Sequence, residues 1–321
     1  MSCAMDRYAA MKRQDDLLRA LYTVYGDAAT LLDPGTAHLV VEGRDVLSRQ
    51  TIPGVEIRAE PMGDVLFAEV RVADGMRVAS PIHTCVGILG ARGAQHIRLH
   101  LALGRQSSAS LLAHCLFPNA ETARHVMEAE IEVGEGADLH YSEGHYHGAS
   151  GGVEVYTRAR VRVGPRARYC ADFSLLTGRV GRLDLDYTIE AAAHAVVEVN
   201  ARVFGHGADE IRIRDEIILA GEEARGLVRT RVAVEDEASA EVLGITRGQA
   251  AGTRGHMDCL ELVRDRARAR AEPIVDVTHP LAKVTHEAAV GTVDQKQIET
   301  LMAHGLAPDA AVDVIITGML R

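Results

Sequence analysis

Hydrophobic and polar residues alternate in short runs along most of the chain. These runs include VEIRAE from Val55, VLFAEVRV from Val65, HIRLHLAL from His96, AEIEV from Ala129, VEVYTRARVRV from Val153, RLDLDYTI from Arg182, VVEVNARVF from Val196 and IRIRDEIIL from Ile211. A period of two is typical of β-strands that bury one face. The pattern predicts a mainly β core over residues 51–288.

Alanine recurs at the turn-like clusters just before several of these strands. The positions are Ala109, Ala137, Ala167, Ala195, Ala224, Ala238 and Ala269. The first four steps are 28, 30, 28 and 29 residues, whereas Ala224 and Ala238 are 14 residues apart, about half a period. A repeat near 30 residues made of strands predicts a coiled sheet such as a β-helix. A sandwich with evenly spaced turns is the alternative.

The C-terminal segment, residues 289–321, predicts a helical hairpin. Thr292 and Gln295 match a capping box at the start of the first helix. Gly305 stands where this helix would stop, and Pro308 suits the first turn of a second helix. Two such short helices are not stable alone, so we expect them to pack on the core or on a partner.

The N-terminal residues and the composition narrow the class of protein. Residues 5–25 show helical spacing and predict an N-terminal helical segment within residues 1–50. The formal net charge of −10 disfavours nucleic acid and anionic membranes as partners. The sequence shows no apolar run of roughly 18 residues and no secretion-signal pattern at its start. We therefore expect a cytoplasmic protein.

The five cysteines are widely spread and include no CxxC pair. They are Cys3, Cys85, Cys115, Cys170 and Cys259. A secreted disulfide framework would be denser and even in number. A structural zinc site or a ferredoxin-type cluster would need closely spaced thiols. Any cluster held by this chain would need other ligand types or a second chain, and Cys85, Cys115 and Cys170 are expected to be buried core residues.

One histidine-rich segment, LHYSEGHYHGASGGVEV, suggests a small metal-binding module. It contains His140, Glu143, His145 and His147, with Glu154 following. An HxH pair places two imidazoles on one face of a strand, which can begin a metal site. The spacing to Glu154 does not match a cupin site, however. The favoured interpretation is a polar surface turn.

The sequence lacks the common motifs of several enzyme classes, which gives little support to a catalytic function. The sequence contains no GxSxG, no HExxH and no GxxxxGK[ST] phosphate loop, so ATP hydrolysis by a P-loop mechanism is excluded for this chain. A β-helix with paired acids could be a carbohydrate-active enzyme. Aromatic residues make up only 4% of the chain and tryptophan is absent, which disfavours this alternative because sugar-binding platforms use aromatic faces.

A cysteine and a histidine–glutamate pair are separated by about one period of the repeat. Glu287 lies 28 residues after Cys259, next to His286. Residues one coil apart stack on neighbouring strands, so a thiol, an imidazole and a carboxylate would converge. These ligand types together suit iron and iron–sulfur species. On spacing alone, a buried apolar Cys259 and a solvated His286–Glu287 cap remain the favoured alternative.

The C-terminal third resembles the SufB/SufD family of iron–sulfur cluster assembly proteins. The resemblance is carried by AKVTHEAAVGTVDQKQIETLMAHGLAPDAAVDVIITGML and by the preceding RGHMDCLELVRDRARARAEPIVDVTHP. It is specific over about residues 200–321 and diffuse over 50–200. The length is similar to that of compact archaeal and anaerobe-type forms, in which one protein serves as both SufB and SufD. The CxxCxxxC-like run of long SufB members is absent from this sequence.

The resemblance implies a fold, partners and ligands. It implies a right-handed parallel β-helix with helical ends, which acts as a scaffold and not as an enzyme. It implies a homodimer that builds a transient cluster at its interface on Cys259, His286 and Glu287. It also implies that a SufC-like ATPase binds the C-terminal helices, which carry Thr292, Gln295, Leu301 and Met302.

Overall fold

The computed structural model describes residues 12, 15, 16, 19 and 33–321. Of the helix predicted over residues 5–25, only four residues are described, and their backbone is helical. The rest of that prediction lies outside the described residues, as does Cys3.

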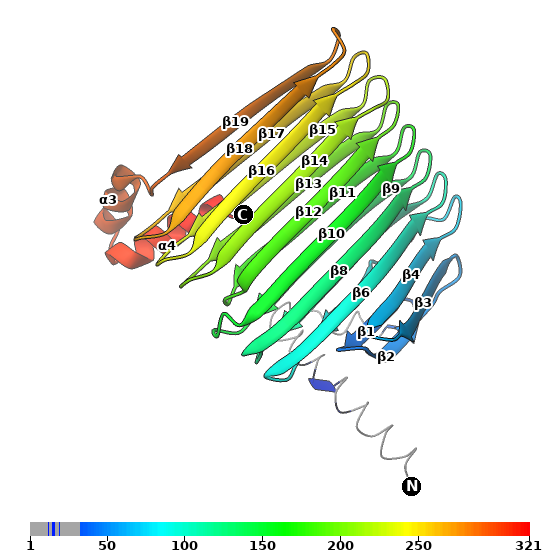
Figure 1. Cartoon of the computed structure of the whole chain (residues 1–321), viewed down its shortest axis with the longest axis horizontal. Coiled ribbons are helices and arrows are strands. Elements are labelled where there is room, and N and C mark those ends of the chain that lie inside the picture. The colour runs from blue at the N-terminus through cyan, green and yellow to red at the C-terminus, as the bar shows by residue number, and fades with distance from the viewer. Residues whose placement is uncertain (1–11, 13–14, 17–18, 20–32) are drawn as a thin grey trace.

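Two long sheets face each other over the described residues (Figure 1). The first has ten strands, in the spatial order β19 (Lys283–Gly291), β17 (Arg254–Val263), β15 (Arg225–Val234), β13 (Val196–Gly205), β11 (Arg168–Thr177), β9 (Asp138–His147), β7 (Ser108–Phe117), β5 (Ile82–Gly87), β1 (His38–Glu42) and β2 (Asp45–Gln50). The second has nine, in the order β18 (Arg268–Val277), β16 (Ser239–Gly248), β14 (Glu210–Leu219), β12 (Gly181–Ala191), β10 (Val153–Val163), β8 (Thr122–Val133), β6 (Arg92–Leu103), β4 (Val65–Val72) and β3 (Val55–Met62).

From β5 onward the chain alternates between the two sheets, and each strand pairs in parallel with the strand one coil away. For example, β11 pairs with β9 and β13, and β12 pairs with β10 and β14. This is a parallel β-solenoid, so the predicted mainly β coiled sheet is confirmed. The eight alternating runs in the sequence all fall within strands.

The core fills the space between the sheets with inward-facing apolar side chains. Along β10 the buried residues alternate with exposed ones, as the period of two requires. Ala167, Ala195 and Ala224 are buried at the corners directly before strands of the first sheet. Ala238 precedes β16 of the second sheet, so the half-period step from Ala224 is the crossing from one sheet to the other.

The two ends of the solenoid differ. At the N-terminal end, β1 pairs with β2 and β3 with β4 in antiparallel hairpins, so strands begin before the boundary expected at residue 51. The division into three segments stays a prediction. At the C-terminal end, β18 and β19 form the last coil, and no further coil covers it in the described part of the chain. Its inward-facing valines are therefore exposed: Val275 by 37%, Val277 by 44% and Val290 by 50%.

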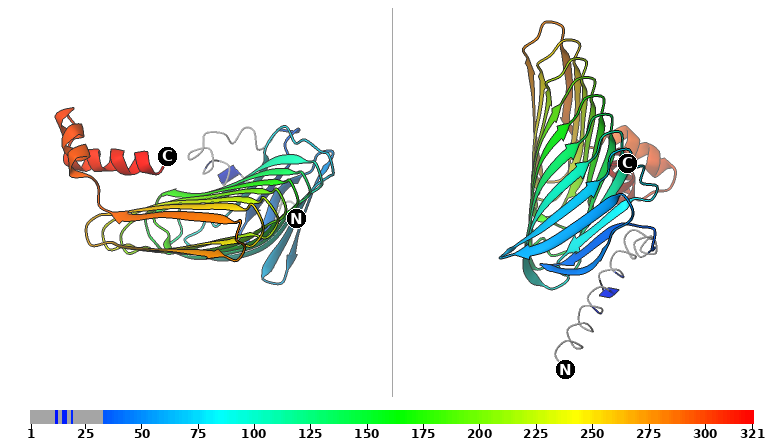
Figure 2. Two further views of the ribbon diagram at one scale, coloured as in Figure 1. Left: turned by 90° about the horizontal axis from the view of Figure 1, so that it is seen from above. Right: turned by 90° about the vertical axis from the view of Figure 1, so that its right-hand side faces the viewer.

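The predicted helical hairpin follows the last coil as α3 (Gln295–Ala303) and α4 (Pro308–Met319). Figure 2 shows both helices outside the solenoid, on one side of it. On α4 and just after it, Ile316 and Leu320 pack against Ala233 on the outer face of the first sheet. In contrast, α3 buries none of its residues. Among the helices that are described, none is both long and apolar enough to cross a lipid bilayer.

Local signals at the hairpin are largely as predicted. Gly305 has a φ of 96°, the left-handed conformation that ends a helix, and Pro308 is the first residue of α4. The capping box at Thr292 is wrong by two positions. Asp294 caps α3 instead, because its carboxylate directly precedes the helix and accepts a hydrogen bond from the Lys296 backbone N–H at 2.9 Å.

Candidate functional site

Cys259 lies on the inner face of β17, between Met257 and Glu261, one strand away from the open end of the solenoid. It is buried, and burial raises the pKa of its thiol to about 12, with a further contribution from Glu261. The thiol is therefore protonated at neutral pH unless a cation is bound to it. A metal ion that binds here must displace this proton.

The register between β17 and β19 decides which residues face Cys259. Cys259 pairs with Ala288, 29 residues later, and Asp258 pairs with Glu287. The expected stacking of Glu287 on Cys259 is therefore wrong by one residue, because this coil is one residue longer than assumed. Alternate residues of a strand point to opposite faces, so Glu287 lies on the outer face beside Asp258.

His286 occupies a different position from its neighbour Glu287. It pairs with Met257, which points inward, so His286 lies on the same face of the sheet as Cys259. It is on the neighbouring strand β19, two residues before Ala288, the residue that pairs with Cys259. His286 and Glu287 are both exposed, because β19 is the last strand of the sheet. Within one chain, the register brings Cys259 and His286 onto one face and leaves Glu287 on the other.

The outer face beside Glu287 carries a row of polar residues in register. Asp172, Asn200, Arg229, Asp258 and Glu287 follow one another on successive strands of the first sheet. The hydrogen bond from Arg231 to Asp258 lowers the pKa of that carboxyl. The Asp258 carboxylate is thus ionised and paired, directly beside the edge residue Glu287.

Two buried carboxyl groups near Cys259 were not predicted from the sequence. Glu261 follows Cys259 by two residues on the same face, and neither of its carboxylate oxygens has a hydrogen-bond partner among the described residues. Asp215 lies on the inner face of β14 in the facing sheet, and its Oδ2 likewise lacks a partner within the described ranges. Burial raises the pKa of each to about 7. The C-x-E spacing at a strand period of two was the signal for Glu261.

Carboxylates without partners in a protein interior are costly, since an unpaired buried charge loses its hydration. A bound cation would offset that cost. The interior beside the open end thus offers one thiol and two carboxyl groups to a positively charged species, and the residues fit iron, which accepts sulfur, nitrogen and oxygen ligands.

The histidine-rich segment is not the surface turn that the sequence suggested. It forms strand β9, and its period of two places Glu143, His145 and His147 inside the solenoid. His140 points outward, and Glu154 lies exposed on β10. The surface-turn interpretation failed because polar residues occupy the inward positions, which hides the alternation of a strand.

The described residues contain two groups of possible metal ligands, and within each group the ligand atoms lie within 4.8 Å of one another. One group is Cys115, Glu143 and His145 inside the solenoid, and the other is His140, Cys170 and Asp172 on its outer face. Neither group includes Cys259. Cys85 and Cys115 are buried, as predicted, whereas Cys170 is half-buried on the outer face.

The fold and these residues together define a class: a parallel β-solenoid with a buried cysteine and unpaired carboxyl groups at an open end. The family model described as "SUF system FeS cluster assembly, SufBD core domain" matches residues 87–319. The chain therefore belongs to the SufBD family of iron–sulfur cluster assembly proteins, and the resemblance noted in the sequence is confirmed.

Curated relatives agree with this assignment. The chain is 33% identical to an iron–sulfur cluster assembly SufBD family protein of Methanocaldococcus jannaschii, over 88% of this chain and 89% of that protein. It is 29% identical to a SufBD family protein of Pyrococcus horikoshii, over 96% and 94% of the two chains. A second, longer P. horikoshii family member is 25% identical, with 78% of this chain matching 56% of that protein.

Proposed function

We propose that this chain is a scaffold on which an iron–sulfur cluster is assembled, with Cys259, His286 and Glu287 as ligands. The observation that supports it most is the position of Cys259: a buried thiol, one strand from the open end, within the segment that matches the family. Thiolate, imidazole and carboxylate are ligands that iron–sulfur species accept. In this proposal the cluster is transient cargo and the chain has no catalytic turnover of its own.

The scaffold in this proposal is a homodimer that forms at the open end. The exposed valines of the last coil form an apolar surface, and β19 is an edge strand that can pair with another chain. A second copy would cover both features. It also addresses the split of the ligands between two faces, because Glu287 of one chain can approach the Cys259 side of the other.

Glu261 and Asp215 belong to the proposed site as an anionic surround for Cys259. Iron ions that enter at the open end would offset their negative charge and would stabilise the thiolate. This role explains why both oxygens of Glu261 and the Oδ2 of Asp215 are kept buried without a hydrogen-bond partner among the described residues.

The ATPase partner in this proposal is a SufC-like protein that binds α3. On α3, Gln295 and Met302 are exposed and Leu301 is half-buried, and Thr292 is exposed just before the helix, so this region presents polar and apolar atoms to a partner. Nucleotide chemistry belongs to that partner. ATP binding would draw the two hairpins of a dimer together, and α4, which is packed on the first sheet, would carry this motion toward the strands that hold Cys259. A cytoplasmic location remains part of the proposal.

Anaerobic reconstitution with iron and sulfide tests the ligand assignment. The wild-type protein is expected to become brown, with sulfide-to-iron charge-transfer absorbance, and Cys259→Ser is expected to lose most of it. Cys170→Ser is the matched control, since Cys170 belongs to the outer-face group of donors. Full colour in Cys259→Ser together with its loss in a His145 variant would instead favour the metal-binding module.

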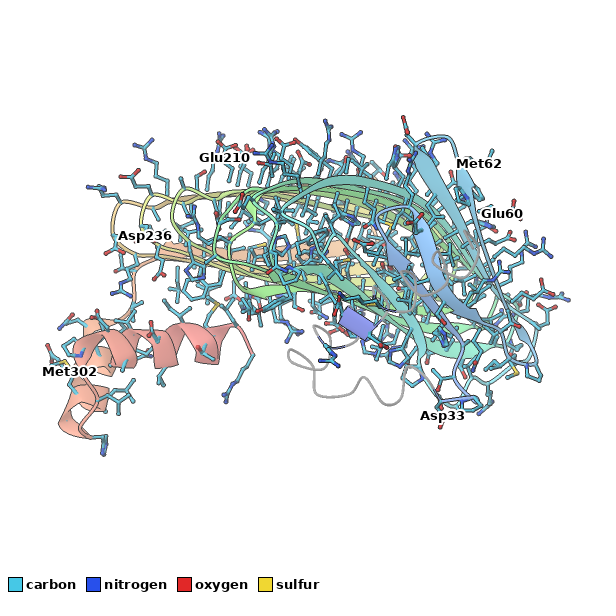
Figure 3. All side chains as sticks on the ribbon, turned by 90° about the horizontal axis from the view of Figure 1, so that it is seen from below. Asp33, Glu60, Met62, Glu210, Asp236 and Met302 are labelled. Carbon is cyan, nitrogen blue, oxygen red and sulfur yellow. The ribbon has the colours of Figure 1, made fainter. Side chains whose placement is uncertain are left out.

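Co-purification tests the partner. An affinity-tagged chain, expressed with the neighbouring genes of its source, is expected to retain an ATP-binding-cassette ATPase. Met302→Asp should weaken this association. Met62→Asp is the control, because Met62 is also exposed but lies at the opposite end of the molecule (Figure 3). Equal retention of the ATPase by both variants would refute the assignment of α3.

A further inference from the structure

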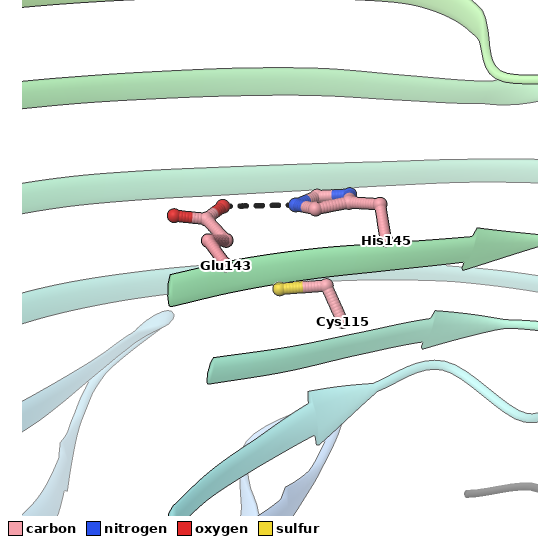
Figure 4. A group of neighbouring side chains, drawn as sticks. All are labelled: Cys115, Glu143 and His145. Atoms are coloured by element: carbon pink, nitrogen blue, oxygen red, sulfur yellow. Dashed lines mark hydrogen bonds and ion pairs between the residues drawn. The ribbon is translucent and has the colours of Figure 1, made fainter. Parts of the chain in front are cut away.

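A second group of metal-ligand atoms lies deep inside the solenoid, away from the open end (Figure 4). Cys115 on β7 pairs in register with His145 on β9, and Glu143 precedes His145 by two residues on the same inner face. From β9 to β17 there are four strand steps in the first sheet, about 19 Å at the usual strand spacing. This cluster is therefore separate from Cys259.

The three side chains are buried almost completely: Cys115 is 0% exposed, Glu143 2% and His145 4%. Their ligand atoms lie within 4.8 Å of one another. His145 Nε2 is 2.9 Å from Glu143 Oε1, and the Tyr141 hydroxyl donates a hydrogen bond to Glu143 Oε2 at 3.0 Å. The other ring nitrogen of His145, Nδ1, is 3.3 Å from Nε2 of His147.

These hydrogen bonds determine the tautomers of the buried rings. A Glu143 carboxylate requires N–H at His145 Nε2, so a neutral His145 has a lone pair at Nδ1, which must accept from His147 Nε2–H. His147 Nδ1 is then a bare nitrogen, and no described residue provides a hydrogen bond to it.

His125, on the facing sheet, also has a buried ring nitrogen without a hydrogen-bond partner among the described residues. The Gln95 side-chain N–H₂ donates to the Gly43 carbonyl at 2.7 Å, which turns Gln95 Oε1 toward His125 Nδ1 at 2.9 Å. His125 therefore carries its proton on Nδ1, and its Nε2 is bare, buried and without a partner within the described part of the chain. Its ring centroid lies 6.2 Å from that of His145. A buried acceptor without a partner costs roughly 1–3 kcal/mol, and His147 Nδ1 and His125 Nε2 are two such atoms among the described residues.

We propose that Cys115, Glu143 and His145 bind one divalent transition-metal ion of the Fe²⁺ and Zn²⁺ class inside the solenoid. A thiolate and a carboxylate cancel the charge of such an ion, so the occupied site is neutral in an apolar interior. Metal–sulfur bonds of about 2.3 Å and metal–nitrogen or metal–oxygen bonds of about 2.0–2.2 Å require the three side chains to close around the ion.

The surrounding residues suit the bound state. His145 would bind the ion through Nε2, which already faces Glu143, and its Nδ1–H would then donate to His147 Nε2. The Tyr141 hydroxyl would still donate its hydrogen bond to Glu143 Oε2. Hydrogen bonds of this kind orient metal-bound imidazoles and carboxylates in known sites. Binding releases one proton, that of the Cys115 thiol, to solvent. His145 exchanges its Nε2 proton for one on Nδ1, and His147 moves its proton from Nε2 to Nδ1, so the protons balance without any redox change.

Cobalt substitution tests the proposal in the full-length chain. The protein carries Cys259→Ser, so that any cluster at the open end is removed, and is folded with Co²⁺ and washed with chelator. One Co²⁺ per chain is expected to remain, with a thiolate-to-cobalt charge-transfer band. Adding Cys115→Ala should abolish this band. Adding Cys85→Ser or Cys170→Ser should leave it unchanged, since neither thiol belongs to the group of Cys115, Glu143 and His145.

A second measurement covers the possibility that a variant folds poorly. Zn²⁺ is expected to raise the thermal unfolding midpoint of the Cys259→Ser protein, and Cys115→Ala should cancel this rise while its midpoint in chelator stays close to that of the parent. The proposal is overturned if chelator removes all cobalt from the parent, if the band survives Cys115→Ala, or if Cys170→Ser removes it. The parent lacks Cys259, so none of these outcomes bears on the proposed assembly function.

Discussion

Asp215 offers a direct way to measure how apolar the interior near Cys259 is. The residue lies on the inner face of β14, is 3% exposed, and burial raises the pKa of its carboxyl from 3.8 to about 7. Below about pH 4 the carboxyl is protonated in both the folded and the unfolded chain. As the pH rises toward 7, the unfolded chain releases the proton while the folded chain keeps it, so stability falls.

The size of this effect follows from the two pKa values. Each tenfold difference in proton affinity corresponds to about 1.4 kcal/mol, so ionised Asp215 lowers the free energy of unfolding by up to about 4 kcal/mol above pH 7. Asp215→Asn removes the charge and keeps the shape. We expect the variant to match the wild type near pH 4 and to be more stable at pH 8 by a few kcal/mol.

Urea unfolding of the apo protein across this pH range checks the prediction. Asp64→Asn is the control, because the Asp64 side chain is fully exposed and its ion pair with Arg44 contributes little. A stability difference between Asp215→Asn and wild type that is the same at every pH would refute the reasoning. So would a variant that is less stable than the wild type at pH 8.

Three further predictions concern the ends and the corners of the solenoid. Ile316→Ala should cost about 2–5 kcal/mol of helix packing and should speed proteolytic removal of α4, while the strands unfold as in the wild type; equal proteolysis would contradict this. Val290→Asp should shift a dimer to monomer in analytical ultracentrifugation, and a dimer of unchanged affinity would argue against an interface at the last coil. Gly152→Ala should destabilise the protein by at least about 1–3 kcal/mol, since the new Cβ would lie 1.7 Å from the Glu121 carbonyl oxygen. Gly90→Ala, whose Cβ meets only an ordinary contact at 3.7 Å, should behave like wild type in the same urea titration.

Much of the fold could be predicted because the solenoid repeats one simple rule. Each coil needs two strands with alternating burial and a small residue at the corner, and alanines such as Ala167 and Ala195 mark that corner in the sequence. The hairpin was predictable from Gly305 and Pro308, which restrict the backbone locally. Only its cap was misplaced, since Asp294 competes with Thr292 for the same role.

The site was harder to predict, for two physical reasons. A shift of one residue in a strand moves a side chain to the opposite face, so a coil of 29 residues instead of 28 separates Glu287 from Cys259. In addition, polar side chains on inward positions break the hydrophobic pattern. Glu143, His145 and Glu261 all point inward, and such local conflicts with the pattern are expected where a protein binds something.

Iron is proposed to bind at Cys259 near the open end. Anomalous diffraction at the iron absorption edge, from crystals of the anaerobically reconstituted protein, tests it most directly. An iron signal is expected within bonding distance of Cys259 Sγ, at a contact between two copies of the chain. Iron found only at the outer-face group of His140, Cys170 and Asp172, with none beside Cys259, would contradict it.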